Sequence, residues 1–215
     1  MPVQSEHVQR YLHDLRPQRS PVMQEMEQFA EREAVPIVHW ETGRFLATLV
    51  RALNPKLVLE VGTAIGYSSL HMAQELSDGA KLVTIDRDPQ RIREAHEYHA
   101  RAGVADKVEI VEGDALEVID RLEGPFDLIF LDGTKGEYPR YLELVDPKAA
   151  EHAALVVDNM LMSGDVALED DSEARWTAEN LAMARGFNHQ AVRSERWLGA
   201  VLPIGDGVVF AARQA

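Results

Sequence analysis

The chain has 215 residues, of which 46% are hydrophobic, and a formal net charge of −14. This length suits one large α/β domain, and the absence of cysteine excludes disulfides, thiolate metal sites and a cysteine nucleophile. The excess acid disfavours non-specific attraction to phosphate backbones, no apolar run could cross a bilayer, and the start of the chain lacks a signal-peptide core, so we expect a cytoplasmic enzyme.

Three helices are predicted before the first strand, at residues 3–15, 20–34 and 41–53. Ser20 and Pro21 form an N-cap followed by proline at the first helical position, which is a well-founded start signal. We expect residues 1–53 to form a helical extension of an α/β core at 56–215, the whole chain being a single domain over 1–215.

From residue 56, short apolar strands alternate with amphipathic helices. The predicted strands are 56–61, 81–85, 107–111, 126–131, 154–157, about 190–197, and 207–212; the helices are 67–76, 89–102, 114–122, 138–151 and 172–186. This alternation predicts an α/β fold with a doubly wound, mostly parallel seven-stranded sheet. The last two strands lack a helix between them, which predicts an antiparallel edge hairpin. Ligands of such sheets bind at the carboxyl ends of the strands.

The first predicted strand ends in a glycine turn, GTAIG, at residues 62–66. Such a turn lets backbone N–H groups approach a ligand, and Asp86 at the end of the next strand can accept the hydroxyls of a ribose. Ala64 replaces the middle glycine of a dinucleotide fingerprint, and Glu60 before the turn would repel a pyrophosphate. The pattern favours the sulfonium cofactor S-adenosylmethionine (SAM) over NAD; the alternative is an ordinary turn without a ligand.

Two later strands end on hard oxygen ligands, Asp132 and the pair Asp158-Asn159. Carboxylate and amide oxygens select Mg²⁺, Mn²⁺ or Ca²⁺ rather than zinc. Lys135 follows three residues after Asp132; beside a bound dication it would give up its proton more readily and could act as a base. The alternatives are an N-capping aspartate and a solvated surface lysine.

Five motifs in order, EVGTAIGYS, TIDRDP, EGDAL, LDGTKGEY and VDNML, resemble the metal-dependent, catechol-type O-methyltransferases, which include the plant caffeoyl-CoA enzymes. Within that family, VPI, GTAIGYS and LPIGDGV are most similar to the bacterial tRNA 5-hydroxyuridine methyltransferases. The resemblance implies SAM and Mg²⁺ (or Mn²⁺ or Ca²⁺) as cofactors. It implies a metal site of Asp132, Asp158 and Asn159, and catalytic roles for Lys135 and Asp132. It implies that the cofactor contacts Val38, Glu60, Gly62, Ser68, Asp86, Gly113, Asp114, Ala115 and Asp132.

The methyl acceptor stays open at this point. The subgroup resemblance favours 5-hydroxyuridine in tRNA, whereas the net charge favours a small catechol or polyphenol-like molecule. Basic residues around the pocket mouth would support tRNA, and an acidic or apolar rim would support the small acceptor. A cofactor-binding protein without turnover is a third interpretation. The resemblance also implies a homodimer. No membrane association is expected, because no apolar run is long enough to cross a bilayer.

Four further segments are weaker candidates. His96 and His99 are expected on a solvated helix face, and His39-Trp40 either stacks on a ligand or packs in the core. Residues 160–176 are interpreted as a lid or a mobile surface loop. Arg193, Arg196 and Trp197 are candidates for receiving the acceptor.

Overall fold

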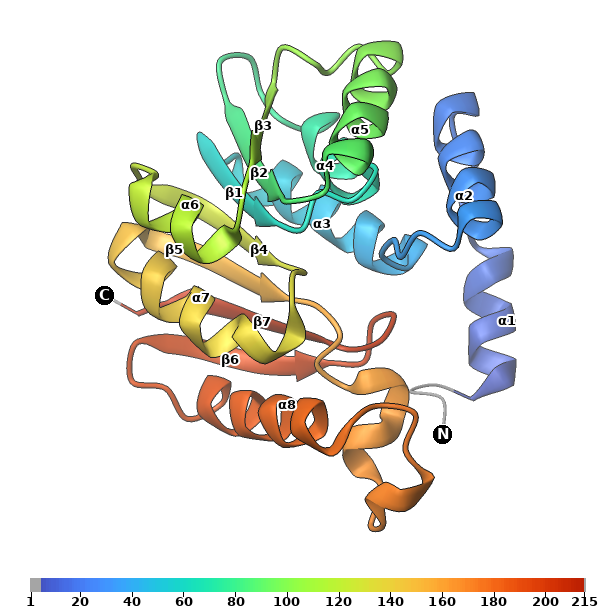
Figure 1. Cartoon of the computed structure of the whole chain (residues 1–215), viewed down its shortest axis with the longest axis vertical. Coiled ribbons are helices and arrows are strands. Elements are labelled where there is room, and N and C mark those ends of the chain that lie inside the picture. Colours follow the sequence, from blue (N-terminus) through green and yellow to red (C-terminus); the bar gives the residue numbers. More distant parts are fainter. Residues whose placement is uncertain (1–4, 215) are drawn as a thin grey trace.

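The computed structural model describes residues 5–214, and the strands in this part of the chain form a single seven-stranded sheet (Figure 1). The sheet order is β3-β2-β1-β4-β5-β7-β6, with β1 to β5 parallel and β7 antiparallel to both of its neighbours. The strands are β1 (Leu57–Val61), β2 (Lys81–Asp86), β3 (Val108–Glu112), β4 (Phe126–Leu131), β5 (Ala149–Val157), β6 (Trp197–Leu202) and β7 (Val208–Arg213). The predicted α/β sheet with an antiparallel edge hairpin is confirmed.

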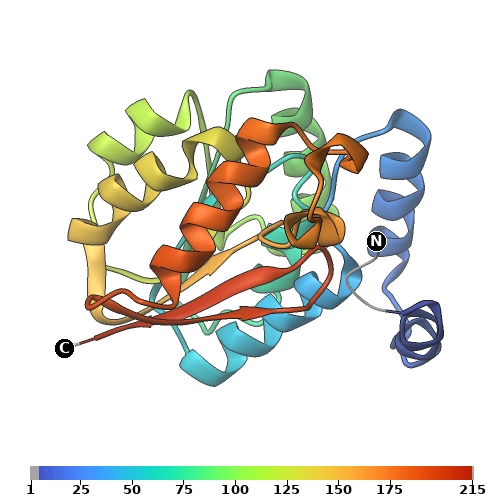
Figure 2. The same cartoon turned by 90° about the horizontal axis from the view of Figure 1, so that it is seen from below.

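Helices cover both faces of the sheet, and Figure 2 shows α8 and α3 on opposite sides of the C-terminal strands. The helices are α1 (Glu6–Asp14), α2 (Pro21–Glu33), α3 (Trp40–Leu53), α4 (Tyr67–Ala73), α5 (Pro89–Arg101), α6 (Ala115–Arg121), α7 (Tyr138–Val145) and α8 (Ala178–Ala191). Residues of α6, α7 and α8 share one core cluster, and residues of α2 to α5 share the other. None of the helices in residues 5–214 is long and apolar enough to cross a bilayer.

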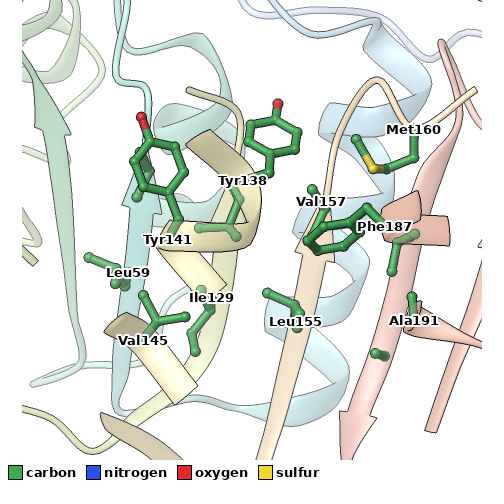
Figure 3. Packing of buried hydrophobic residues seen from close by; sticks show 14 of the residues in the cluster. Leu59, Ile129, Tyr138, Tyr141, Val145, Leu155, Val157, Met160, Phe187 and Ala191 are labelled. Atoms are coloured by element: carbon green, nitrogen blue, oxygen red, sulfur yellow. The ribbon is translucent and has the colours of Figure 1, made fainter. Parts of the chain in front are cut away.

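The central strands are apolar because both of their faces are covered. In the cluster shown in Figure 3, Leu59, Ile129 and Leu155 from adjacent strands pack with Val145 of α7 and Phe187 of α8. The same view shows the phenol groups of Tyr138 and Tyr141 pointing toward the end of the sheet where β5 leads into Met160. The core therefore fixes α7 so that its first turn faces the carboxyl ends of the strands.

The N-terminal helices lie beside the α/β core (Figure 1). Ser20 caps α2 as predicted, its hydroxyl accepting from Met23 N at 3.3 Å. The Glu27 carboxylate of α2 accepts hydrogen bonds from Arg16, from Arg19 and from the Tyr67 hydroxyl at the start of α4. By contrast, α1 has no buried residue. Positions 3–4 of the first predicted helix lie outside the described residues.

Four elements predicted in the C-terminal half have wrong bounds. The helix predicted at 138–151 ends at Val145, because Pro147 lies in the next turn, and the strand predicted at 154–157 already begins at Ala149. The helix predicted at 172–186 is α8 at Ala178–Ala191, since Thr177 is its N-cap and accepts from Asn180 N. The strand predicted at about 190–197 therefore starts only at Trp197.

Candidate active site

A cavity of about 550 Å³ opens at the carboxyl ends of the parallel strands. Its walls come from the ends of β1 and β2, from the segments that follow β3, β4 and β5, and from residues 36–39 before α3. Every predicted site residue except Glu60 and Ser68 lines this cavity. The sheet thus brings together, at one edge, residues that are far apart in the sequence, while their individual roles stay predictions.

The glycine turn after β1 forms part of the cavity wall through Gly62 and Ala64. Gly62 has φ +102°, and a side chain there would overlap the Asp132 carbonyl oxygen, so the position requires glycine. Ala64 also has a positive φ, of 44°, and its N–H donates to Asp86 Oδ2 at 2.7 Å. The turn therefore packs closely against Asp132, which follows β4, and is hydrogen-bonded to Asp86 at the end of β2.

Glu60 and Ser68 lie beneath the turn instead of in the cavity wall. Glu60 is fully buried and accepts hydrogen bonds from Ser68 Oγ and Thr84 Oγ1, both at 2.6 Å. Burial raises the pKa of Glu60 to about 8, against the opposing effect of these two hydroxyl donors. Both side chains therefore lie behind the cavity wall, because β1 directs the Glu60 side chain into the interior and Ser68 of α4 bonds to it there.

The polar residues expected to face a nucleoside lie at the β2 and β3 end of the cavity. Asp86 accepts from the backbone N–H of Ala64 and of Asp88, and Asp114 caps α6 by accepting from Leu116 N at 2.9 Å. Gly113 and Ala115 flank Asp114 in the lining, and the buried Val38 approaches from the segment before α3. Both carboxylates are therefore held by backbone donors in fixed positions at the cavity wall.

Asp132 and Lys135 form an ion pair inside the cavity. Lys135 Nζ lies 2.7 Å from Asp132 Oδ1 and donates a second hydrogen bond, also of 2.7 Å, to the Tyr138 hydroxyl. Tyr138 is fully buried, and burial raises its pKa well above the ordinary value, so its phenol stays neutral. The Lys135 ammonium is thus anchored at two points beside the end of β4.

Asp158 and Asn159 follow β5, the neighbour of β4 in the sheet, and carry the best evidence for a cation site. Asp158 is 2% exposed, and its Oδ1 has no hydrogen-bond partner. Burial, followed by repulsion from Asp132, raises the pKa of Asp158. A buried carboxylate oxygen without a partner is costly, and a divalent cation between Asp132 and Asp158 would satisfy this oxygen and remove the repulsion. The donor set of two carboxylates and one amide fits Mg²⁺. A metal site built from three or more His, Cys, Asp or Glu side chains does not occur in residues 5–214.

A contact at the β5 end of the cavity joins three segments and was not predicted from the sequence. Asp206, in the turn between β6 and β7, lies 3.4 Å from His39 Nε2 and accepts from Ser163 Oγ at 2.8 Å. The hydrogen bond to Asp206 raises the pKa of His39 and lowers that of Asp206. The position of Asp206 could have been predicted from the sequence. Because β7 was expected to be antiparallel, the turn that precedes it must lie at the same edge of the sheet as the end of β5.

Aromatic and charged residues complete the wall around the predicted metal ligands. Trp176, Tyr141 and Glu137 line the cavity, and the Tyr141 hydroxyl donates to Glu137. At this end Lys135 and His39 are each paired with a carboxylate, whereas Arg87 and Arg91 lie at the opposite end, beside β2 and α5. The rim near Asp158 is therefore acidic and aromatic, and its cations are neutralised.

The weaker candidates have other positions. His96 is exposed as expected, but the prediction for His99 is wrong, because it is buried and contacts Ser69. Arg196 and Trp197 both bond to Asp146 at a second cavity of about 290 Å³, away from the predicted site. Trp40 begins α3 under the Arg16 guanidinium, whose carbon lies 5.6 Å from the ring centre. Residues 160–176, interpreted as a lid or a mobile surface loop, contain two short 3₁₀ segments to which Arg185 of α8 is hydrogen-bonded.

An open parallel sheet with a glycine turn after β1 and an acid at the end of β2 defines a nucleoside-cofactor-binding α/β protein. A family model described as O-methyltransferase matches residues 14–214. A catechol O-methyltransferase of Mycobacterium tuberculosis is 33% identical over 172 residues, covering 76% of this chain and 78% of the relative. A caffeoyl-CoA O-methyltransferase of Stellaria longipes is 27% identical over 98% of this chain and 92% of the relative.

The solved structures agree with the sequence comparisons. An O-methyltransferase from Bacillus cereus, in complex with SAH, superposes with a TM-score of 0.83 at 26% identity, over 97% of each chain. The chain therefore belongs to the O-methyltransferase family of the catechol and caffeoyl-CoA type, whose members transfer a methyl group from SAM to oxygen.

Proposed function

We propose that this enzyme is a Mg²⁺-dependent O-methyltransferase whose acceptor chelates the ion through two neighbouring oxygens. The observation that carries the proposal is the unpartnered, buried Oδ1 of Asp158, in the same cavity as the glycine turn and the Lys135–Asp132 pair. Asp132, Asp158 and Asn159 would hold Mg²⁺, or Mn²⁺ or Ca²⁺ in its place. The ion would supply positive charge that orients and acidifies the acceptor hydroxyl.

In this proposal the nucleoside end of the cavity holds SAM, whose methyl group is already activated by the positive sulfur. Gly62 and Ala64 would offer backbone atoms to the methionine part, Asp86 would accept the ribose hydroxyls, and Asp114 with Gly113 and Ala115 would contact the adenine. Val38 would cover the cofactor, and Asp132 would face it from β4. The carboxylates in the wall suit a ligand that carries a sulfonium and an ammonium group.

Lys135 would accept the proton of the acceptor hydroxyl at Nζ. To do so the ammonium must first release its own proton to solvent and leave the Asp132 carboxylate, which would exchange its contact with the ammonium for the ion. The protein must also align the two reactants. The acceptor oxygen must lie in line with the bond from sulfur to methyl, roughly 3 Å from the methyl carbon, and water must be excluded. His39 and Trp176 also line the cavity and would help to exclude water from the acceptor.

The acidic and aromatic rim favours a small catechol-like acceptor. Glu137 and Asp206 would repel the phosphates of a nucleic acid, and the cations at this end already have carboxylate partners. The 33% identity with a catechol O-methyltransferase supports the same acceptor class. The resemblance of VPI, GTAIGYS and LPIGDGV to the tRNA 5-hydroxyuridine methyltransferases keeps that nucleoside as the second candidate, since its O5 and the adjacent carbonyl oxygen chelate in the same way.

The deciding experiment offers both acceptor classes with labelled SAM, with Mg²⁺ and with EDTA. We expect methylation of catechols that stops in EDTA, and faster reaction with a cationic catecholamine than with an anionic dihydroxybenzoate. Glu137→Gln should reduce the difference in rate between the two acceptors, and Glu97→Gln, at an exposed residue outside the cavity, is the control. If undermodified tRNA is methylated and the catechols are not, the result would favour 5-hydroxyuridine in tRNA as the acceptor. Full activity in EDTA would exclude the metal mechanism.

We further propose a homodimer in which α1 packs on the partner. The helix has no buried residue, and Val8, Tyr11 and Leu15 form an exposed apolar stripe along it. A helix of nine residues is marginal in water unless its apolar face is covered.

A further inference from the structure

The glycine turn that would hold SAM is supported from behind by a histidine of another helix. His99 of α5 is 1% exposed, and its Nε2 lies 2.9 Å from Ser69 Oγ and 3.3 Å from the Gly66 carbonyl oxygen. Gly66 is the last residue of the turn and the N-cap of α4, and its position has no side chain to cap the helix. The imidazole therefore reaches the point at which the turn becomes α4.

The contact between His99 and the turn is close enough to restrict both partners. Gly66 has φ +83°, and a Cβ placed on it would lie 2.6 Å from His99 Nε2 and 3.2 Å from Ala95 Cβ. Glycine is therefore needed here for its conformation and for the space that the imidazole occupies. A side chain added at position 66 would displace the imidazole and break its contact with the first turn of α4.

The charge state of the imidazole suits this contact. Burial lowers the pKa of His99 to about 4, so the ring is neutral under physiological conditions. With its proton on Nε2, the ring donates to the Gly66 carbonyl and to Ser69 Oγ; with the proton on Nδ1, it accepts from the Ser69 hydroxyl. Either tautomer satisfies a polar atom at the buried beginning of α4.

On the cavity side, the same turn is fixed by Asp86, which binds Ala64 N at 2.7 Å. The short segment from Ala64 to Gly66 is therefore held at its exposed end from β2 and at its buried end from α5. Because α5 follows β2 directly in the chain, both supports belong to one strand–helix unit. A ligand that contacts the turn would find its backbone N–H groups already oriented, which lowers the ordering cost of binding.

We propose that His99 is a positioning residue for the cofactor site: it holds Gly66 and Ser69 so that the turn is preformed for SAM. The inference rests on the proposed placement of SAM in this cavity. His99 does not line the cavity, so it acts through Gly66 and Ser69 and not through contact with the ligand. It follows that His99 should affect cofactor affinity and leave the methyl transfer itself unchanged.

The test is calorimetric titration of the full-length protein with SAH, without metal or acceptor, on His99→Leu, His99→Gln, Ser69→Ala and the control His96→Leu. Leucine fills the space but offers no polar atom, whereas the glutamine amide can donate to both Gly66 O and Ser69 Oγ. We expect His99→Leu to weaken SAH binding about five-fold or more, and Ser69→Ala about two- to three-fold. His99→Gln should return to within two-fold of wild type, and the exposed His96→Leu should not differ from it.

A steady-state comparison distinguishes positioning from a general loss of structure. For His99→Leu, KM for SAM should rise while kcat at saturating SAM stays within about two-fold. Wild-type SAH affinity in His99→Leu would overturn the inference, as would a His99→Gln as weak as His99→Leu when both melt like wild type. If His99→Leu does not fold, wild-type SAH affinity and KM in Ser69→Ala would overturn it instead. Failure of the wild-type protein to bind SAH would contradict the proposed cofactor site and not the role of His99 alone.

Discussion

Lys135 Nζ lies 2.7 Å from Asp132 Oδ1, so the proposed base is paired with a proposed metal ligand. The Tyr138 hydroxyl holds the same nitrogen from the other side. The pair is a resting arrangement, because Lys135 can accept a proton only after its own has left. The Asp132 carboxylate, which pairs with Lys135, is thus also the one that would bind a divalent cation.

Lys135→Ala should lower turnover by about 100-fold or more, the usual contribution of a general base. Its affinity for SAH should stay close to that of wild type, because the nucleoside contacts lie at the other end of the cavity. Initial rates at saturating SAM and calorimetry with SAH measure the two effects, and the exposed Lys56→Ala is the control. Unchanged turnover would remove Lys135 as the base.

Asp158→Asn should reduce Mg²⁺-stimulated turnover by about 100-fold or more, since even outer-shell partners of a metal typically contribute ~10–100-fold. The same change should raise the melting temperature of the metal-free protein, because it removes a buried carboxylate that is repelled by Asp132 and has an unpartnered oxygen. Titration with Mn²⁺ and thermal unfolding in EDTA check both effects, with the exposed Asp78→Asn as the control. A variant with full metal-dependent activity would refute the assignment.

Glu60 should make the folded protein less stable as the pH rises from about 4.5 to about 8. The carboxyl of the unfolded chain ionises at its ordinary pKa of 4.5, whereas burial keeps the folded carboxyl protonated up to about 8. The free energy of unfolding therefore falls as the pH rises across this window. The fall amounts to up to a few kcal/mol, because each unit of pKa difference between the folded and unfolded states corresponds to ~1.4 kcal/mol. Denaturant unfolding of wild type and Glu60→Gln at pH 5 and pH 8 should show a smaller loss in the variant. Equal losses would mean that Glu60 is ionised in the folded state throughout this window.

Tyr11→Lys combined with Leu15→Lys should shift the proposed homodimer toward monomer. Both side chains lie on the exposed apolar stripe of α1, and a buried lysine without a partner opposes association. Analytical ultracentrifugation over a range of concentrations measures the shift. Gln9→Lys, on another face of the helix, is the control with the same type of charge. A wild-type protein that is monomeric at all concentrations would contradict the proposal directly.

The fold could be predicted because its signals are local. The apolar strands, the Ser20-Pro21 start and the glycine turn each lie within a few neighbouring residues. The parallel sheet then brings Asp86, Asp132 and Asp158 to one edge as a consequence of topology. The α8 boundaries were missed because the acidic segment before Thr177 has helix-forming residues but turns twice as 3₁₀ helix.

The remaining parts of the site depend on contacts between distant elements. His99 looks like a solvent-facing residue in sequence, and only its approach to Gly66 and Ser69 buries it. Glu60 carries the signal of a strand-end ligand, but the direction of its side chain places it under the turn. Asp206 could have been found from the antiparallel direction of β7, whereas its contact with His39 depends on how the turn before β7 packs against the segment before α3.

The Glu27 carboxylate joins α2 to Tyr67, which directly follows Gly66 in the chain. A molecule that displaces α2 would therefore act on the proposed SAM pocket through the Glu27–Tyr67 hydrogen bond. Antibodies or small binders raised against this helix would offer a way to control the enzyme from residues that do not line the cavity.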